Sequence, residues 1–315
     1  MAILRPSPVS PTRGITLKIV SVMVFIIMTS LIKETAPLVP AGEQVFFRSL
    51  FAIPVIFGWL MLRGEGARVL RTPRPMGHFY RGLVGTAAMG LGFAATGMLP
   101  LPEVTAIGYA APLLTVIFAA MFLGEEVRAF RMTAVALGLV GVMIVLSPRL
   151  SVASAGGLTA RETLGAMLVL MSAVFAALAQ IFVRRLVQEE PASTIVFWFS
   201  ITSTVLALVT LPYGWVWPDP LTAVQLVAIG LLGGAAQILL TSAYRHADAS
   251  LVAPFEYASM LFALLIGYFV FGEAPTLVML TGAAIIIAAG VLIIWRERQL
   301  GLARARQRKA MTPHG

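Results

Sequence analysis

Cysteine is absent from this 315-residue sequence, and histidine occurs three times. The chain can therefore form no disulfide, thiol nucleophile or cysteine-based metal site. His78, His246 and His314 fall near predicted helix ends or in the C-terminal tail, which excludes a His-rich metal site. We accordingly expect no metal and no cofactor. Charged residues are also scarce: they make up 12% of the chain, against about 25% in a soluble domain.

The sequence consists largely of long apolar runs. Hydrophobic residues account for 59% of the chain, and its mean hydropathy is +0.91. Many runs reach the roughly 20 residues that cross about 30 Å of hydrocarbon, so the composition predicts a protein of the lipid bilayer. The formal net charge of +9 comes largely from basic residues that flank these runs, and we expect no nucleic-acid partner.

The first apolar run starts at Ile19, after Arg5, Arg13 and Lys18. A charged start is typical of a signal peptide, but no small-residue cleavage site follows, and the run ends at Lys33-Glu34. We interpret it as an uncleaved first span. A lone span must satisfy its own backbone hydrogen bonds, so each run is predicted to be a helix rather than a barrel strand. Ten such segments can be counted, at residues 16–32, 44–62, 79–97, 103–123, 130–147, 163–183, 194–211, 221–243, 250–271 and 276–295.

The distribution of basic residues predicts the orientation of these spans. With the N-terminus inside, nineteen of the 23 Lys and Arg residues fall on the inner side, and three, Lys33, Arg149 and Arg161, fall on the outer side. Arg48 lies within a span. Inner loops carry the excess of Lys and Arg in membrane proteins, so we expect both termini in the cytoplasm of a bacterial cell with the protein in its inner membrane.

The second half of the chain repeats the first. The stretch Pro102–Leu146 returns 148 residues later, so that Tyr109 falls on Tyr257 and Gly124-Glu125 falls on Gly272-Glu273. Because each copy has five spans, an odd number, the second copy enters the membrane from the opposite side. This predicts an all-α integral membrane fold of ten transmembrane helices in two inverted five-helix repeats, the architecture of secondary transporters.

The repeats define the expected domain organisation. We predict a cytoplasmic N-terminal tail at residues 1–15, the first repeat at 16–147, an outer linker at 148–162, the second repeat at 163–296 and a basic cytoplasmic tail at 297–315. The linker is small and polar and should be a flexible loop. The tail is Arg-rich and has no apolar period, so we expect it to be disordered and close to anionic lipid.

The order of these motifs resembles the drug/metabolite transporter superfamily, EamA family. The resemblance covers about residues 16–296 and rests on the two Gly-Glu dipeptides, Pro112, the run Phe46–Arg48 and the glycine-rich third and fifth spans. The halves have diverged, since Met260 and Phe199 stand at the positions equivalent to Pro112 and Arg48. The resemblance implies a cavity lined by spans 1–4 and 6–9, with spans 5 and 10 at the periphery.

A narrower resemblance concerns substrate. The runs GEQVFFRSLFAIP, HFYRGLVGTAAMGLGF and LPLPEVTAIGYAAPLL are similar to a bacterial branch that includes riboflavin uptake carriers. This implies import of a small planar or amphipathic metabolite, with riboflavin as the first specific candidate. Export or exchange of amino acids or related metabolites is the alternative.

Polar residues inside spans are candidate substrate or gating groups, because intramembrane charge is costly and is a functional hypothesis by default. Arg48 lies near the outer end of its span. It either contacts the substrate or a gate, or it forms a structural ion pair or extends its cation to the nearby headgroups. Glu103 sits at a similar depth, where it either pairs with Arg48 or stabilises a helix N-terminus. Glu256, two turns inside the inner end of its span, is the candidate for a coupling proton, against a structural hydrogen bond across the bundle.

Four uncharged side chains complete the candidate site. Tyr109 and Tyr257 are repeat mates that either stack on a planar ligand or pack helices. Gln180 and Gln237 lie deep in their spans and are interhelical hydrogen-bonding groups or ligand contacts. The two Gly-Glu dipeptides are interpreted as structural helix ends, because glycine takes the left-handed conformation that terminates a helix.

Three classes of function follow from these features. A secondary carrier for a small molecule is favoured, and without a P-loop the chain has no ATP site of its own. A membrane-embedded enzyme would need a clustered catalytic constellation, and the sequence has no HExxH motif, no cysteine and no paired intramembrane Asp. A structural or sensory subunit would not need the inverted repeat. The sequence leaves the oligomeric state open, a homodimer included.

Overall fold

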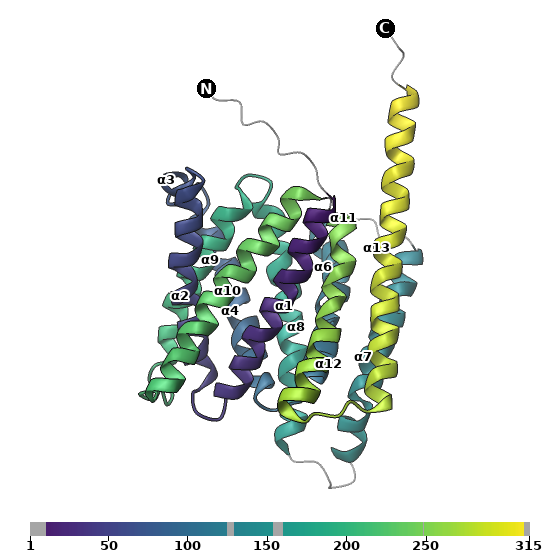
Figure 1. The fold of residues 1–315 in the computed structure, drawn as a ribbon. Helices are drawn as coiled ribbons and strands as arrows, with labels where there is room; N and C mark the ends of the chain where they lie inside the picture. Colours follow the sequence, from purple (N-terminus) through teal and green to yellow (C-terminus); the bar gives the residue numbers. More distant parts are fainter. Residues whose placement is uncertain (1–10, 125–128, 154–159, 248, 312–315) are drawn as a thin grey trace.

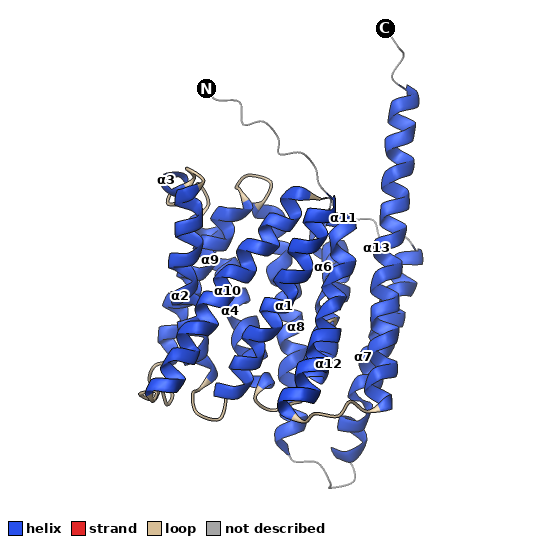
Figure 2. Ribbon diagram, viewed as in Figure 1, coloured by secondary structure: helices blue, strands red, loops and turns tan. Residues whose placement is uncertain are grey.

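The computed structural model describes residues 11–124, 129–153, 160–247 and 249–311 as an all-helical bundle (Figures 1 and 2). The first residues of α1 and the last of α13 lie at one end of the bundle, which we term the termini side; the opposite end is the far side. The predicted fold class, an all-α membrane protein of two five-helix repeats, is confirmed.

Each repeat contains four long helices and one span that is divided. The helices of the first repeat are α1 (Pro11–Thr35), α2 (Ala41–Leu62), the short α3 (Gly66–Val69), α4 (Pro75–Thr96), α5 (Leu101–Gly108), α6 (Ala110–Leu123) and α7 (Ala129–Ala153). Those of the second repeat are α8 (Ala160–Leu186), α9 (Ala192–Ala207) with η1 (Leu208–Thr210), α10 (Pro220–His246), α11 (Ala249–Val252), η2 (Ala253–Tyr257), α12 (Ala258–Phe271) and α13 (Leu277–Met311).

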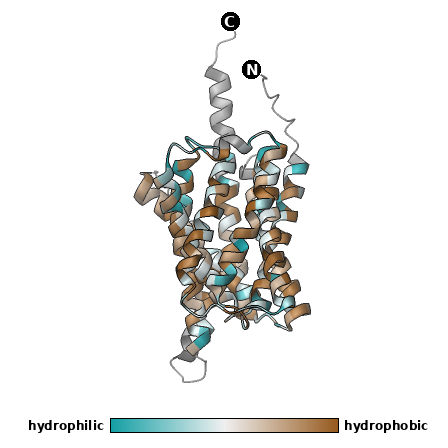
Figure 3. Ribbon diagram, turned by 90° about the vertical axis from the view of Figure 1, so that its left-hand side faces the viewer, coloured by the Kyte–Doolittle hydropathy of each residue, from teal (hydrophilic) through white to brown (hydrophobic). Residues whose placement is uncertain are grey.

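Nine helices in the described part of the chain are long and apolar enough to cross a membrane. The tenth predicted span is α4, which has 22 residues and packs among the others but carries His78 and Arg81 within its first two turns. Large apolar side chains are exposed on the helices, among them Met121, Val205 and Phe269, and hydrophobic residues occur along the full length of the helices in Figure 3. Such a surface requires lipid around it.

The two spans that the sequence predicts as continuous, 103–123 and 250–271, each have a local break in regular α-helical hydrogen bonding at a tyrosine, where the backbone stays right-handed helical. Tyr109 lies between α5 and α6, and Tyr257 ends η2 before α12. Pro112 has no N–H to donate back to Gly108, which removes the hydrogen bond that would have bridged the first break. In the second, Pro254 stands at the start of the 3₁₀ turn. The breaks therefore fall at equivalent points of the two repeats.

The repeats interleave rather than sit apart. α1 packs on α10, α4 on α8, α2 on α9 and α7 on α13, so each contact joins one helix of the first repeat to one of the second. In the last pair the helices cross at Gly141 and Gly282, where a Cβ on either glycine would meet the partner's carbonyl oxygen at 2.9 or 2.7 Å. This pair lies at one edge of the bundle, as the resemblance implied for spans 5 and 10 (Figure 1).

Two expectations about the connecting segments are wrong. The predicted linker starts at residue 148, but α7 continues past Pro148 to Ala153, and α8 already begins at Ala160. The predicted disordered tail is helical, because α13 runs on to Met311. Ala, Leu, Arg, Gln and Lys are strong helix formers, and they extend a helix even where no apolar face is present. Glu125 lies outside the described residues.

Candidate functional site

A cavity region lies between the repeats, on the termini side of the broken spans. It consists of two chambers of about 620 and 680 Å³ that share Gln180, Leu240 and Tyr244 in their walls. The first chamber extends to Trp59, Glu65 and Arg245 at the ends of helices on the termini side, and its wall includes Arg81. The second contains Lys18, Gly108, Tyr109, Pro112, Arg184, Glu256, Tyr257 and Ile294. Volumes of this size hold a small organic molecule.

The structure brings most of the predicted site residues to this cavity. Gln180 is exposed on its wall and belongs to both chambers, and Gln237 lines the first. Tyr109, Glu256 and Tyr257 line the second. Cavity-lining residues also come from α13, since Ile294 forms part of the second wall, which the resemblance did not imply. Their functional roles stay predictions.

Tyr109 and Tyr257 meet at the base of the second chamber. Their rings lie edge to face, with centroids 5.0 Å apart and planes at 69°. The Tyr109 hydroxyl is 2.5 Å from the Ser259 hydroxyl, and Ser259 donates in turn to the carbonyl of Glu256 at 2.6 Å. Because the two tyrosines are repeat mates, the approximate two-fold axis of the repeats passes between them. The edge-to-face arrangement joins the broken spans at their breaks.

Glu256 forms an ion pair with Lys18 of α1. The two partners differ sharply in burial: the Lys18 side chain is 1% exposed, whereas that of Glu256 is 50% exposed to the cavity. The ammonium also lies 5.6 Å from the centroid of the Tyr244 ring. The predicted alternative of a structural contact across the bundle is therefore present, while the carboxylate still reaches the cavity.

Arg48 is buried, at 7% exposure, and approaches the ring of its own repeat mate. Its Cζ lies 6.0 Å from the centroid of Phe199 on α9. Arg81 of α4 lies over the same ring at 3.5 Å. Room for the two guanidinium groups comes from a second pair of repeat mates: a Cβ at Gly233 would be 3.1 Å from Arg48 Nε, and one at Gly85 would be 3.0 Å from Arg81 Nη1.

The predicted ion pair between Arg48 and Glu103 is absent, although both residues lie in the described part of the chain. Glu103 occupies the first turn of α5, where a carboxylate is favoured by the helix dipole, the second of the two roles considered for it. Arg48 points instead toward α9 and α10. Arg48 lies two turns into α2, which is deeper than the position near the helix end predicted from the sequence.

On the far side, an ion pair joins the two repeats. Lys33 Nζ lies 2.7 Å from Glu273 Oε1 and donates to the carbonyl of Leu99 at 2.6 Å. Glu273 Oε2 accepts from the backbone N–H of Leu101 at 2.8 Å, so the carboxylate also caps α5. Glu273 follows Gly272, whose φ of 66° ends α12 as the sequence predicts, but its carboxylate contacts the other repeat rather than solvent alone. These contacts hold the two repeats together on the far side.

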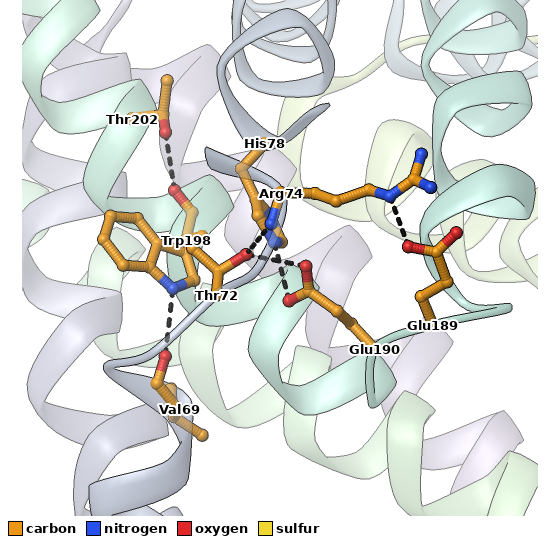
Figure 4. Close-up of polar contacts among 8 residues, drawn as sticks. All are labelled: Val69, Thr72, Arg74, His78, Glu189, Glu190, Trp198 and Thr202. Atoms are coloured by element: carbon orange, nitrogen blue, oxygen red, sulfur yellow. Dashed lines mark hydrogen bonds and ion pairs between the residues drawn. The ribbon is translucent and has the colours of Figure 1, made fainter. Parts of the chain in front are cut away.

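On the termini side, a buried polar cluster links the loop after α3 to the turn between α8 and α9 (Figure 4). Glu190 accepts from the Thr72 hydroxyl at 2.7 Å and lies 2.9 Å from His78 Nε2. Trp198 Nε1 donates to the carbonyl of Val69 at 3.0 Å. Outside this cluster, Arg74 pairs with the neighbouring carboxylate of Glu189. The cluster fixes one rim of the cavity.

The chemistry of the cavity is that of a binding site. Within the described residues, no group of three His, Asp or Glu side chains is placed to hold a metal ion. The charged groups on the walls include Arg81, Arg184 and the Lys18–Glu256 pair, and aromatic and amide side chains lie on the same walls. Such walls can bind a small polar molecule and release it unchanged.

Comparison with known proteins decides the family. The model of the EamA-like transporter family matches residues 12–147 and again 163–295, which together cover most of the chain. The chain belongs to the EamA-like transporter family. It is therefore a multi-pass integral membrane protein and a secondary transporter of small metabolites, and it is not an enzyme. The EamA resemblance stated from the sequence is confirmed.

Curated relatives of this transporter have diverse substrates in their names. It is 29% identical over 281 residues to the pseudopaline exporter of Pseudomonas aeruginosa, covering 89% of this chain and 95% of the relative. It is 28% identical over 258 residues to an S-adenosylmethionine uptake transporter of Rickettsia bellii, covering 82% of this chain and 84% of the relative. It is 28% identical over 261 residues to a riboflavin transporter of Rhizobium johnstonii (82% of each).

A solved crystal structure shares the fold. It superposes with a TM-score of 0.64 at 22% sequence identity, over 92% of this chain and 99% of the other. At that identity the likeness concerns the arrangement of helices alone.

The cations of the cavity wall, Lys18 and Arg81 among them, were not predicted from the sequence. Lys18 and Arg81 were both counted among the inner flanking charges, because basic residues at span ends usually orient a membrane protein. A signal existed in each case: Lys18 directly precedes the apolar run, and Arg81 follows the start of α4 by nearly two turns. Basic residues at that depth are already past the helix end.

Proposed function

We propose that the cavity between the repeats is the substrate path of this EamA transporter, and that it works by alternating access. The observation that carries the proposal is the position of the cavity. It begins at the two tyrosines where the spans break, and its walls reach the helix ends on the termini side, while the Lys33–Glu273 pair joins the repeats on the far side. Broken spans at the interface of inverted repeats are typical substrate sites of secondary transporters.

Two specific substrates remain candidates. Riboflavin uptake is the first, and it is supported by the aromatic walls contributed by Trp59, Tyr109, Tyr244 and Tyr257 and by the name of one relative. Export or exchange of amino acids or related metabolites is the second. The second is favoured by the charges on the cavity wall, since the isoalloxazine ring of riboflavin is uncharged and would leave Arg81 without a partner.

The path itself can be tested by filling it. A Cβ on Gly108 would meet nothing within 4 Å, and Gly108 lines the cavity. Gly108→Trp should therefore occupy the path and abolish transport with little effect on folding. Gly58→Trp is the matched control, because Gly58 is exposed on α2 and also has nothing within 4 Å. Equal transport by the two variants would place the path elsewhere.

Riboflavin is tested in a strain that lacks its own riboflavin synthesis. Uptake of labelled riboflavin should rise when the wild-type chain is expressed and fall to the background with Gly108→Trp. If growth still needs a high external riboflavin concentration, riboflavin is removed as a candidate. Untargeted mass spectrometry of cells and medium, again comparing wild type with Gly108→Trp, then identifies a metabolite whose distribution depends on an open cavity and gives the direction of transport.

We further propose that both termini are cytoplasmic, on the strength of the asymmetry of Lys and Arg. The natural absence of cysteine makes this simple to test. A single cysteine at Gly64, in the turn after α2 on the termini side, should resist a membrane-impermeant maleimide in intact cells. One at Gly214, in the loop before α10 on the far side, should react. The reverse pattern would invert the orientation.

A further inference from the structure

Two cations at the centre of the bundle have no anion beside them. Arg48 on α2 and Arg81 on α4 approach the same Phe199 ring. Within the described residues, no carboxylate pairs with either guanidinium, and Arg48 Nε, Arg81 Nε and Arg81 Nη1 are buried without hydrogen-bond partners. Every nitrogen of a guanidinium is a donor, so these are strong donors with nothing to donate to.

A buried cation without a partner is unfavourable, and proteins keep one where it serves a purpose. The Phe199 ring compensates part of the cost, because its π face attracts a cation. It cannot accept the in-plane hydrogen bonds of the guanidinium fork. Those bonds match a carboxylate, which accepts two of them side by side. Since Arg81 lines the cavity, a carboxylate in the cavity can reach it.

The remaining charges of the cavity select among anions. Glu65 lies on the wall of the first chamber, and Glu256 is half exposed in the second. Arg245 pairs with Glu65 and Lys18 pairs with Glu256, so the walls offer charges of both signs. They suit a molecule that carries a cationic group as well as a carboxylate. The two chambers are adjacent and share Gln180, Leu240 and Tyr244 in their walls, which places Arg81 and Glu256 on either side of these three side chains.

We propose that Arg81 binds the carboxylate of a zwitterionic, amino-acid-type ligand and that Glu256 faces its ammonium group. Arg48 is a positioning residue: it holds Phe199 from the side of α2 and adds positive potential behind Arg81. This site rests on the proposed function, because it bears on transport only if the cavity is the substrate path. The proposal also explains the asymmetry between the repeats, in which Phe199 replaces the second copy of Arg48 and serves as the platform for both cations.

Binding is measured on the purified full-length chain by thermal melting, because a ligand that binds the folded state raises the melting temperature. The probes are the protein-forming L-amino acids one at a time, S-adenosylmethionine, glycerol 3-phosphate and riboflavin. We expect at least one amino-acid-type compound to stabilise the wild type. Its amino-alcohol counterpart, which lacks the carboxylate, should bind about ten- to a hundredfold more weakly, the usual loss for a charge-assisted hydrogen bond.

Substitutions then locate the carboxylate. Arg81→Gln should lower the affinity for the amino-acid-type ligand by the same ten- to hundredfold. Arg81→Lys should retain part of that affinity, because it keeps the charge but loses the two parallel N–H donors of the guanidinium. Arg48→Gln should narrow the preference for the amino acid over its amino alcohol, which a purely structural role would leave unchanged. Arg296→Gln is the matched control: Arg296 also lies over a ring, 5.8 Å from the centroid of Phe130, but on α13 outside the cavity.

Three outcomes would overturn the proposal. In the first, no compound in the set stabilises the wild type. In the second, the best ligand is glycerol 3-phosphate or riboflavin. In the third, Arg81→Gln and Arg81→Lys both elute as folded monodisperse protein and bind the amino acid as tightly as Arg296→Gln. Counterflow of the bound compound into proteoliposomes separates this proposal from the proposed function. Binding without counterflow contradicts the transport path alone, and counterflow that is unchanged in Arg81→Gln contradicts the carboxylate site alone.

Discussion

The ring of Tyr109 meets the ring of Tyr257 edge to face at 5.0 Å, so two residues that are 148 positions apart in sequence are neighbours on the approximate two-fold axis. Each tyrosine stands at the break of its span. A change in the angle between the repeats must therefore pass through this contact. The tyrosine pair is therefore a direct contact between the divided spans of the two repeats.

Gly290 of α13 is required by this arrangement. A Cβ at Gly290 would lie 1.6 Å from the Tyr257 hydroxyl and 2.5 Å from its Cζ. Gly290→Ala should force the ring aside, lower the melting temperature by the equivalent of about 1–3 kcal/mol and slow transport. Adding Tyr257→Phe to Gly290→Ala should restore part of the melting temperature and part of the transport rate, since it removes the hydroxyl but leaves the ring. Gly58→Ala is the control, and identical melting curves for Gly290→Ala and Gly58→Ala would refute the clash.

The Lys18–Glu256 pair should respond unequally to loss of its two partners. Removing the carboxylate with Glu256→Gln leaves a buried ammonium beside the Tyr244 ring, whereas Lys18→Met leaves a carboxylate that is half exposed to the cavity. We expect Glu256→Gln to lower the melting temperature more than Lys18→Met, and the double variant to recover most of the loss, because an unpaired buried charge is the costly state. Equal effects, or additive ones, would show that the burial difference does not matter.

The two adjacent glutamates after α8 offer a paired test of burial. Glu190 is 5% exposed and accepts from Thr72 beside His78, while Glu189 pairs with Arg74 on the surface. Glu190→Gln should cost about 1–3 kcal/mol of stability, the usual cost of disrupting a buried hydrogen-bonded group. Glu189→Gln should cost at most about 1 kcal/mol, as is typical of exposed ion pairs. Chemical or thermal unfolding in detergent measures both, and the reverse order would contradict the structure.

The Lys33–Glu273 pair should govern access from the far side. Glu273→Gln removes the charge but keeps an oxygen that can still accept from Leu101, so it isolates the ion pair from the helix cap. With a single cysteine at Gln180 in the cavity, labelling by an impermeant maleimide from the far side should rise several-fold. Glu34→Gln, an exposed carboxylate one residue from Lys33, is the matched control. No rise above that control would mean that other contacts close the far side.

The sequence is sufficient for the architecture because lipid leaves few alternatives. A run of about 20 apolar residues must be a helix, and an odd number of spans per copy inverts the second copy. The tail departs from its prediction because helical propensity, which extends α13 to Met311, does not depend on an apolar period. The breaks at Tyr109 and Tyr257 were not predicted, although Pro112 removes a backbone hydrogen bond one turn after Gly108.

The site was less accessible from sequence than the fold. Tyr109 and Tyr257 were singled out as repeat mates, but their contact depends on how the broken spans pack. Arg48 was placed beside Glu103, whereas helix rotation directs it to Phe199. Lys18 and Arg81 sit one or two turns deeper than the charges that orient the protein, and they were counted with those flanking charges because their depth follows from where each helix begins.

α1 carries a lysine near each end, and both lysines reach the same stretch of the second repeat. Lys18 pairs with Glu256 and Lys33 with Glu273, which lie at the start and just past the end of the divided span of η2 and α12. Fifteen residues of helix separate the lysines by about 22 Å. The divided span is thus held against α1 at both ends by lysine–glutamate ion pairs. Both ion pairs are formed in this structure, so a transition that separates α1 from either end of the divided span must break a lysine–glutamate pair, and these pairs contribute to the barrier between the two states of the carrier.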